Sequence, residues 1–230
     1  MKPPRFYRSF DYQKSLLPNA YLASLEEGIA STEEAQAFTG YTIGNPGWGL
    51  IYYLLMSHLD RNDENIIVET GTNIGCTTII LAQALKDSKA RGHVFTVELE
   101  ATNYFRALDN WKRAHVDNFI TAFNCDSKIA LRQIVGAHGN IKAALLDASH
   151  LYDDVLEEFE IVRSYLAPNA LVIFDNTYQI AEPHEDQRVH GALHEIKKRY
   201  GGNLINLEFV SWYTPGLAIW QQTPFNPCQF

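Results

Sequence analysis

From Ile66 onward the chain alternates short apolar runs with longer amphipathic segments, and this alternation limits the fold more than any other feature. The apolar runs are expected to be strands over 66–70, 93–98, 119–124, 141–147 and 170–175. Most are apolar almost throughout, as in strands that helices cover on both faces. The segments between them are helical candidates: 75–89, 102–115, 127–137 and 152–166. Repeated strand–helix–strand order predicts an α/β fold with a parallel sheet and right-handed crossovers.

The end of the chain breaks this alternation. A helix near 186–200 leads into "NLINLEFVSWY", then "TP", then "GLAIWQQ". Two β-rich runs joined by a short Pro/Gly turn predict an antiparallel hairpin. We therefore expect a Rossmann-like, doubly wound sheet of seven strands, mostly parallel, that finishes in a hairpin. Asp154 followed by Glu157 is a candidate capping box for the helix 152–166.

The first part of the chain differs from the rest. Residues 1–60 look helical and rich in aromatic side chains, and we expect a helical cap that covers the substrate site. The polar stretch "RNDEN" (61–65) connects it to residues 61–230, the expected α/β domain. Tyr41, Trp48, Tyr52 and Tyr53 are candidates for a pocket wall, although core packing suits most of them better.

Composition excludes several classes of protein. The chain has 230 residues, 46% of them hydrophobic, which fits one sizeable domain. It lacks an apolar run long enough for a membrane span and begins without the apolar core of a signal peptide. Three widely spaced cysteines argue against a disulfide framework, so a cytoplasmic protein is expected. A net charge of -8 argues against a general affinity for nucleic acid.

A glycine-containing loop, "VETGTNIGCTT", follows the first predicted strand. Gly71 and Gly75 allow a tight turn and the close approach of a ligand to the backbone. With Glu69 they form an E-x-G-x-x-x-G pattern. A dinucleotide site would show G-x-G-x-x-G, and a phosphate loop would end in Gly-Lys-Ser/Thr, so NAD and ATP are disfavoured. A plain glycine turn between strand and helix is the structural alternative.

Polar residues also follow the next two strands. Glu98 closes the second strand, where a carboxylate can bind both ribose hydroxyls. Asp126 and Ser127 follow the third strand, where they could receive an adenine amino group, although Asp126 is equally suited to cap a helix. Ligands of open α/β sheets bind at these carboxyl ends.

Over about residues 40 to 222 the sequence resembles the class I S-adenosylmethionine-dependent methyltransferases. The resemblance implies S-adenosylmethionine as cofactor. The residues that it implies in cofactor binding are Glu69, Gly71, Thr72, Asn73, Gly75, Thr77, Glu98, Asp126, Ser127 and Asp147.

A second cluster of polar residues ends the fourth and fifth strands. Asp147 follows "KAALL", with His150 three positions later, and Asp175 and Asn176 follow "ALVIF". Adjacent parallel strands would bring Asp147, Asp175 and Asn176 together. Two carboxylates and an amide oxygen suit Mg²⁺, Mn²⁺ or Ca²⁺ and suit zinc poorly. The structural alternatives are a helix cap at Asp147 and a turn at Asp175–Asn176.

This set resembles the metal site of the catechol O-methyltransferase-like enzymes. In addition, "LLDASHLYDDV" is similar to the D-x-x-H-x-Y segment of the cephalosporin-hydroxylase and macrocin O-methyltransferase-like group, which implies His150 as general base. The sequence departs from the patterns of these families at two places. "PNA" (168–170) stands where Pro-Gly-Gly is frequent, and Asn169 can adopt the left-handed conformation instead. Asn176 stands where the macrocin-like group often has an acidic residue.

The resemblance implies transfer of a methyl group to a hydroxyl of a small molecule, such as a catechol, a sugar diol or another natural product. Alternatives are a metal-independent methyltransferase, a cofactor-binding protein without activity and, last, an oxidative enzyme. A homo-oligomer is compatible with the aromatic N-terminus.

His190 and His194 are spaced i, i+4, but Gly191 stands where a zinc protease needs Glu, so a solvated or capping role is preferred. His184 lies in a polar loop that could border the substrate pocket.

Overall fold

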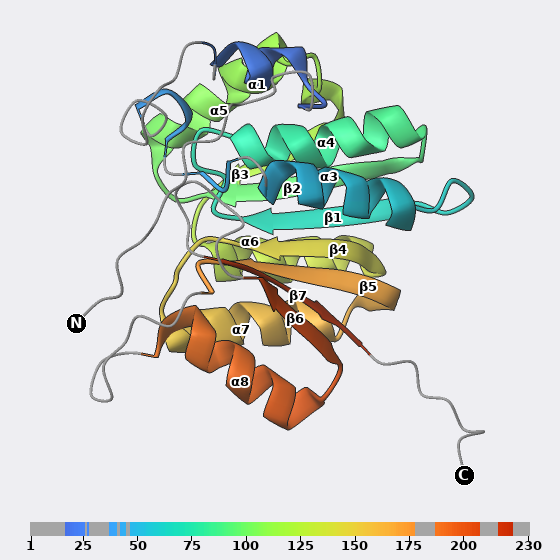
Figure 1. Ribbon diagram of the computed structural model, residues 1–230, viewed down its shortest axis with the longest axis vertical. Coiled ribbons are helices and arrows are strands. Elements are labelled where there is room, and N and C mark those ends of the chain that lie inside the picture. The colour runs from blue at the N-terminus through green and yellow to red at the C-terminus, as the bar shows by residue number, and fades with distance from the viewer. Residues whose placement is uncertain are drawn as a thin grey trace.

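The computed structural model describes residues 17–25, 27, 37–40, 42–44, 47–177, 187–207 and 216–222. At its centre is a seven-stranded sheet with the strand order β3-β2-β1-β4-β5-β7-β6 (Figure 1). The strands β1 to β5 are parallel, and β7 runs antiparallel to both of its neighbours, β5 and β6. The predicted mixed sheet is therefore confirmed. Its strands are β1 (Asn65–Thr70), β2 (Gly92–Glu98), β3 (Ile120–Asn124), β4 (Ile141–Leu146), β5 (Leu166–Asp175), β6 (Asn203–Leu207) and β7 (Leu217–Gln221).

Helices cover both faces of the sheet, which is why the central strands are apolar almost throughout. One face packs against α3, α4 and α5, and the other packs against α6, α7 and α8. Each predicted helix from residue 75 onward is present with bounds that differ by a few residues. The helices are α1 (Ala20–Leu25), α3 (Gly47–His58), α4 (Cys76–Ser88), α5 (Ala101–Arg113), the 3-10 helix η2 (Asp117–Phe119), α6 (Ser127–His138), α7 (Tyr152–Arg163) and α8 (Arg188–Tyr200).

The described part of the N-terminal segment packs against α4 and α5. Asn19 Nδ2 donates to Gln83 Oε1 at 2.8 Å, and Trp48 Nε1 donates to Thr77 Oγ1 at 3.1 Å. Trp48 is fully buried, so core packing is confirmed for it, whereas Tyr53 is 63% exposed. Tyr41 and His184 lie outside the described residues. The boundary of the cap at residue 60 stays a prediction.

Two local predictions differ from the structure. The strand β5 begins at Leu166 instead of residue 170, and the backbone bends within it at Asn169, which takes the expected left-handed conformation (φ 63°). The capping box is wrong: α7 begins at Tyr152 after Leu151, and Asp154 lies inside its first turn. There the Asp154 carboxylate binds Lys128 Nζ at 2.7 Å and Ser149 Oγ at 2.6 Å. Asp154 therefore forms an ion pair with Lys128, which is 26 residues away in the sequence, instead of capping the helix.

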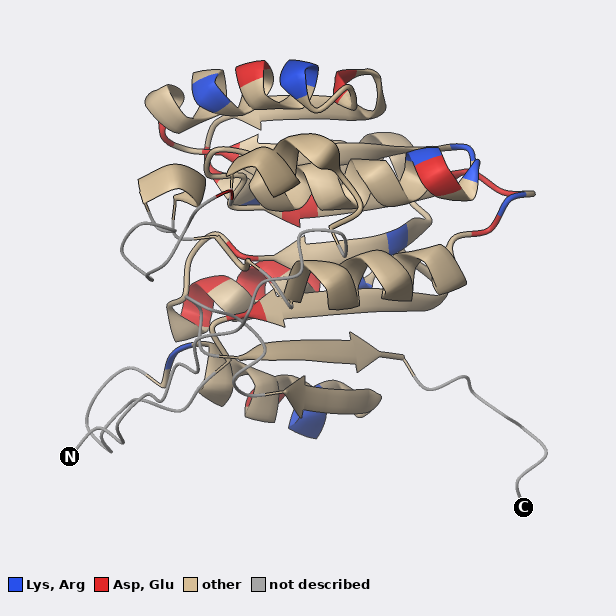
Figure 2. Cartoon of the chain, turned by 45° about the horizontal axis from the view of Figure 1, so that its top comes forward, with Lys and Arg blue, Asp and Glu red and all other residues tan. Residues whose placement is uncertain are grey.

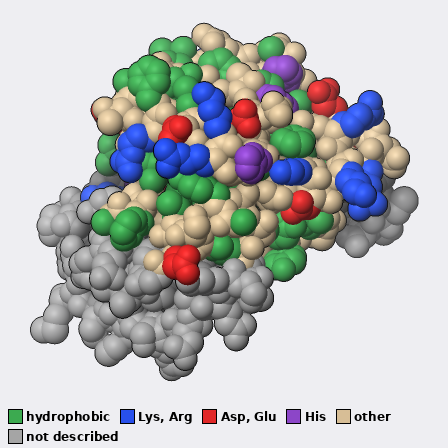
Figure 3. Space-filling model, turned by 90° about the horizontal axis from the view of Figure 1, so that it is seen from above, with side chains coloured by type: hydrophobic (Ala, Val, Ile, Leu, Met, Phe, Trp, Pro, Cys, Tyr) green, Lys and Arg blue, Asp and Glu red, His purple; other side chains and the backbone are tan. Residues whose placement is uncertain are grey.

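Two further features of the structure concern the length of its helices and the charge on one of its faces. No helix within the described ranges combines the length and the apolar character that crossing a bilayer requires. On the face seen from above in Figure 3, basic side chains are interspersed with acidic, histidine and hydrophobic ones.

Candidate active site

The five parallel strands end at one edge of the sheet, where a cavity of about 550 Å³ lies. Acidic residues also gather near this edge (Figure 2). The helices that follow β1 and β4 cover opposite faces, so a crevice opens between these two neighbouring strand ends, where open α/β sheets bind ligands. Most of the predicted site residues line the cavity: Gly71, Thr72, Asn73, Thr77, Glu98, Asp126, Ser127, Asp147, His150 and Asn176.

Gly71 is required by the approach of two chain segments. Its φ is 78°, and a Cβ atom there would lie 2.0 Å from the carbonyl oxygen of Asp147. The backbone after β1 therefore passes directly against the backbone after β4. This contact joins the predicted cofactor loop to the predicted metal ligand.

Gly75 and Glu69 do not line the cavity, so the structure does not support the direct cofactor contact predicted for them. Gly75 precedes α4 with φ 82°, and a Cβ there would lie 2.3 Å from Trp111 Nε1. The Glu69 carboxylate is 1% exposed and accepts hydrogen bonds from Thr78 Oγ1 and Thr96 Oγ1, both at 2.6 Å. Burial raises the pKa of Glu69 to about 7. Gly75 and Glu69 therefore have structural roles next to the glycine loop: Gly75 allows the close packing of Trp111, and Glu69 binds two buried hydroxyls.

Glu98 fixes the glycine loop and also faces the cavity. Its Oε2 accepts from the amide of Asn73 at 2.6 Å, and its Oε1 accepts from the amide of Glu100 at 2.8 Å. The Asn73 side chain in turn donates to the carbonyl of Gly40. A carboxylate held in this way still has lone pairs for hydroxyl donors, as ribose binding requires.

Asp126 caps a helix, as its structural alternative proposed. Its Oδ1 accepts from the amides of Lys128 at 2.9 Å and Ile129 at 3.3 Å at the start of α6. Because Asp126 also lines the cavity, the cap does not exclude a contact with a bound cofactor.

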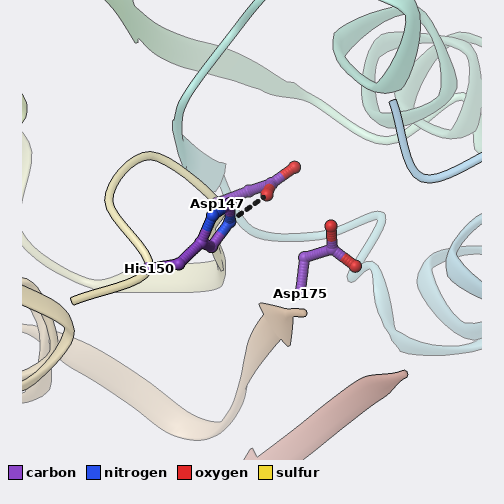
Figure 4. Close-up of side chains that lie close together, drawn as sticks. All are labelled: Asp147, His150 and Asp175. Carbon is purple, nitrogen blue, oxygen red and sulfur yellow. Dashed lines mark hydrogen bonds and ion pairs between the residues drawn. The ribbon is translucent and has the colours of Figure 1, made fainter. Parts of the chain in front are cut away.

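Asp147 and His150, which line the cavity, converge with Asp175, which does not line it (Figure 4). One ligand atom from each lies within 4.8 Å of the others. Leu146 pairs with Phe174, so the register of β4 and β5 places the two aspartates that follow side by side. His150 Nε2 is 3.2 Å from Asp147 Oδ1. The sequence prediction that these strand ends meet is confirmed.

Asn176 contacts the His150 ring more closely than Asp147 does. Its Nδ2 lies 2.9 Å from His150 Nε2 and 3.2 Å from Nδ1. The amide nitrogen and oxygen exchange places when the side chain rotates by half a turn. Either group of Asn176 is therefore available at this end of the cavity, an amide donor to the imidazole or an oxygen to a cation.

A buried hydroxyl fixes the backbone of Asp147. Thr70 Oγ1 donates to Glu158 Oε2 at 2.9 Å and accepts from the amide of Asp147 at 3.2 Å. The Glu158 carboxylate is 1% exposed and comes from the middle of α7. Neither Thr70 nor Glu158 was predicted from the sequence, because neither lies at a loop position that a motif marks.

Burial shifts the pKa values of the convergent groups in opposite directions. It raises the pKa of the Asp147 carboxyl well above its usual range. The nearby Glu69 and Glu158 raise it further, whereas a hydrogen bond with Asp175 lowers it. Burial lowers the pKa of His150, and Asp175 opposes this shift. His150 is therefore neutral near pH 7 and can accept a proton.

The donor set fits a hard divalent cation. Two carboxylates at short range repel each other when both are ionised, and a cation between them removes this conflict. Carboxylate oxygens, an amide oxygen and remaining positions for water or substrate are the coordination that Mg²⁺ accepts in proteins. Asp147, Asp175 and Asn176 would hold the ion.

The cavity also has walls that the motifs did not predict. They include Thr42 from the N-terminal segment, Leu99 and Asn103 beside Glu98, Cys125 before Asp126, and the group Lys128, Ser149 and Asp154. Their positions next to predicted residues could have suggested most of them. Thr42 follows Tyr41, a candidate for a pocket wall, and its Oγ1 lies 3.0 Å from Thr77 Oγ1.

Known proteins share this architecture. Residues 68–177 match a family model described as a methyltransferase domain. The O-methyltransferase TomG from Streptomyces achromogenes, solved with S-adenosylmethionine, superposes with a TM-score of 0.71 at 18% identity, over 89% of this chain and 91% of that one. The O-methyltransferase from Bacillus cereus, solved with S-adenosylhomocysteine, gives 0.69 at 19% identity, over 89% and 96%.

A methyltransferase from Geobacter sulfurreducens gives a TM-score of 0.64 at 18% identity, over 91% of this chain and 92% of that one. No curated protein sequence matches the chain significantly. At such identities the likeness to solved structures concerns the fold. The family model indicates the domain type, since residues 68–177 match that of a methyltransferase domain, and the chain has a Rossmann-like methyltransferase fold.

Proposed function

We propose that this chain is an S-adenosylmethionine-dependent O-methyltransferase that acts on a small molecule with the help of a divalent cation. One observation carries the proposal. A single cavity is lined by the glycine loop, by Glu98 and by Asp147 and His150, and Asp175 lies next to the last two, with ligand atoms of the three within 4.8 Å of one another. Binding of a nucleoside cofactor alone would not need the second group.

The residues divide the chemistry between them. When bound, S-adenosylmethionine supplies a methyl group on a positively charged sulfur, and a hard cation lowers the pKa of an acceptor hydroxyl. His150 takes the hydroxyl proton. The carbon–oxygen bond forms as the carbon–sulfur bond breaks, which leaves a methyl ether and S-adenosylhomocysteine. The residues that line the cavity would hold the cofactor and the acceptor so that the reacting atoms lie close to a line.

The acceptor that suits this site best offers two neighbouring oxygens. One oxygen would be methylated and the other would help to hold the molecule at Asp147, Asp175 and Asn176. Catechols and vicinal sugar diols have this arrangement, and natural products of both kinds are suitable first acceptors.

Calorimetric titration tests the two halves of the cavity separately. We expect S-adenosylhomocysteine to bind the wild type and Asp175→Asn equally, since Asp175 does not line the cavity, and Mg²⁺ to bind only the wild type. Failure of S-adenosylhomocysteine to bind either protein would refute the cofactor assignment. Equal Mg²⁺ binding by both proteins would refute the metal assignment.

Methyl transfer to catechols and vicinal diols tests the role of His150. His150→Gln is expected to lower kcat by about 10² to 10⁴-fold while the binding of S-adenosylhomocysteine is retained. Full activity of the wild type in excess chelator would indicate a metal-independent methyltransferase. Transfer to none of these acceptors, with the cofactor bound, would indicate a binding protein.

A further inference from the structure

The helix α8 carries a pair of histidines that lies outside the cavity. His190 and His194 are one helical turn apart, and their Nε2 atoms face each other at 3.1 Å. The ring centroids are 4.7 Å apart with an interplanar angle of 63°. His194 is exposed and His190 is half-buried.

A backbone carbonyl determines which nitrogen of His190 is free. His190 Nδ1 lies 3.2 Å from the carbonyl oxygen of Thr177, and a carbonyl can only accept a hydrogen bond. Nδ1 therefore carries the hydrogen, and the lone pair of Nε2 points toward His194. The carbonyl is itself held in place, because Thr177 Oγ1 donates to Asn206 Oδ1 on β6. An imidazole that donates its second N–H to a carbonyl is the usual arrangement of a metal-bound histidine.

The distance between the two Nε2 atoms also matches metal coordination. Metal–nitrogen bonds of about 2.0 to 2.1 Å place two neighbouring ligands of a tetrahedral or square site about 2.9 to 3.4 Å apart. The observed 3.1 Å falls within this range. Gly191, which excludes the zinc-protease motif, has a packing reason, since a Cβ there would lie 2.2 Å from Gln187 Cβ.

We propose that His190 and His194 form a second metal site, selective for borderline transition-metal ions such as Ni²⁺, Cu²⁺ or Zn²⁺. Two neutral imidazoles favour these ions over Mg²⁺, in contrast to the carboxylate-rich set at Asp147 and Asp175. Water completes the coordination around the two histidine ligands. The site is independent of the proposed methyl transfer.

Titration of the untagged full chain with Ni²⁺ in saturating Mg²⁺ tests the site. We expect one Ni²⁺ equivalent on the wild type, bound at least about tenfold more weakly by His194→Ala and by His190→Ala. His138→Ala, which removes an exposed histidine from α6, is the matched control and should bind as the wild type does. In Cu²⁺-loaded protein, the electron paramagnetic resonance spectrum should show coupling to two imidazole nitrogens.

Asp175→Asn separates this site from the cavity. A second Ni²⁺ equivalent taken by the carboxylate set would be lost in Asp175→Asn and kept in His194→Ala. Unchanged Ni²⁺ affinity in His194→Ala, or an equal loss in His138→Ala, would overturn the proposal. The result of the Ni²⁺ titration does not depend on whether the protein transfers methyl groups.

Discussion

The buried carboxyl of Glu69 makes the stability of this protein depend on pH. Glu69 ionises near pH 4.5 when unfolded, whereas burial raises its pKa to about 7 in the fold. Its protonated form therefore contributes stability that is complete below pH 4.5 and is lost as the pH rises through 7.

Glu69→Gln should remove this dependence. Between pH 5 and pH 8 we expect the free energy of unfolding of the wild type to fall by about 2 to 3 kcal/mol relative to that of the variant. Urea unfolding of both proteins at the two pH values, without cofactor, measures the difference. Parallel pH profiles would mean that Glu69 is ionised in the fold.

Gly71 has a steric role that another glycine lacks. In Gly71→Ala the new Cβ would clash with the Asp147 carbonyl, and φ would remain in the left-handed region. We expect a loss of about 1 to 3 kcal/mol in stability and weaker binding of both S-adenosylhomocysteine and Mg²⁺.

Gly136→Ala is the matched control for Gly71→Ala. Gly136 lies inside α6, and no atom would lie within 4 Å of its added Cβ. Alanine there should stabilise the protein by about 0.5 to 1 kcal/mol. Denaturant unfolding and calorimetry compare the two variants, and equal effects would contradict the steric explanation.

At the scale of elements, the Thr70 hydroxyl joins β1, α7 and the end of β4. Thr70→Val removes the donor to Glu158 and one of two acceptors for the Asp147 amide, which also donates to the Thr70 carbonyl at 3.2 Å. Leaving these buried groups without that partner should cost about 1 to 3 kcal/mol and weaken Mg²⁺ binding about 10 to 100-fold. Thr70→Ser keeps the hydroxyl and should restore both. Calorimetric titration with Mg²⁺ would refute this role if the valine variant bound as tightly as the wild type.

Strands and helices were predictable from the sequence where periodicity and strand ends carry the information. The order of apolar runs predicted the parallel part of the sheet, and the residues after β4 and β5 predicted where Asp147 and Asp175 meet. The roles of Glu69, Asp154 and Thr70 were not predictable, because each depends on a partner that only the tertiary structure brings near.

At the scale of the whole molecule, the helix α3 of the N-terminal segment packs in the main hydrophobic core. Trp48, Ile51 and Leu55 of α3 are fully buried and pack in the same apolar cluster as α4. Loss of such side chains exposes the apolar face of α4 to water.

A chain of residues 61–230 alone should therefore fail to fold cooperatively. We expect a broad urea transition and weak near-ultraviolet circular dichroism for this truncated chain, and a sharp transition for the full chain. Trp48→Ala in the full chain should cost about 3 to 5 kcal/mol. A truncated chain with the same transition midpoint as the full one would show that the segment is a separate cap.

The strand order has a consequence for how such a protein can change over evolution. The glycine loop, Glu98 and Asp126 come from the first half of the sheet, and Asp147, His150 and Asp175 come from the second half. Among the described residues, the halves pair through β1 and β4, close to Thr70 and Gly71. Under the proposed function, mutations around β5 therefore alter the acceptor side of the cavity while the glycine loop and Glu98 stay intact, so descendants of one ancestor would diverge in acceptor and keep the same methyl donor.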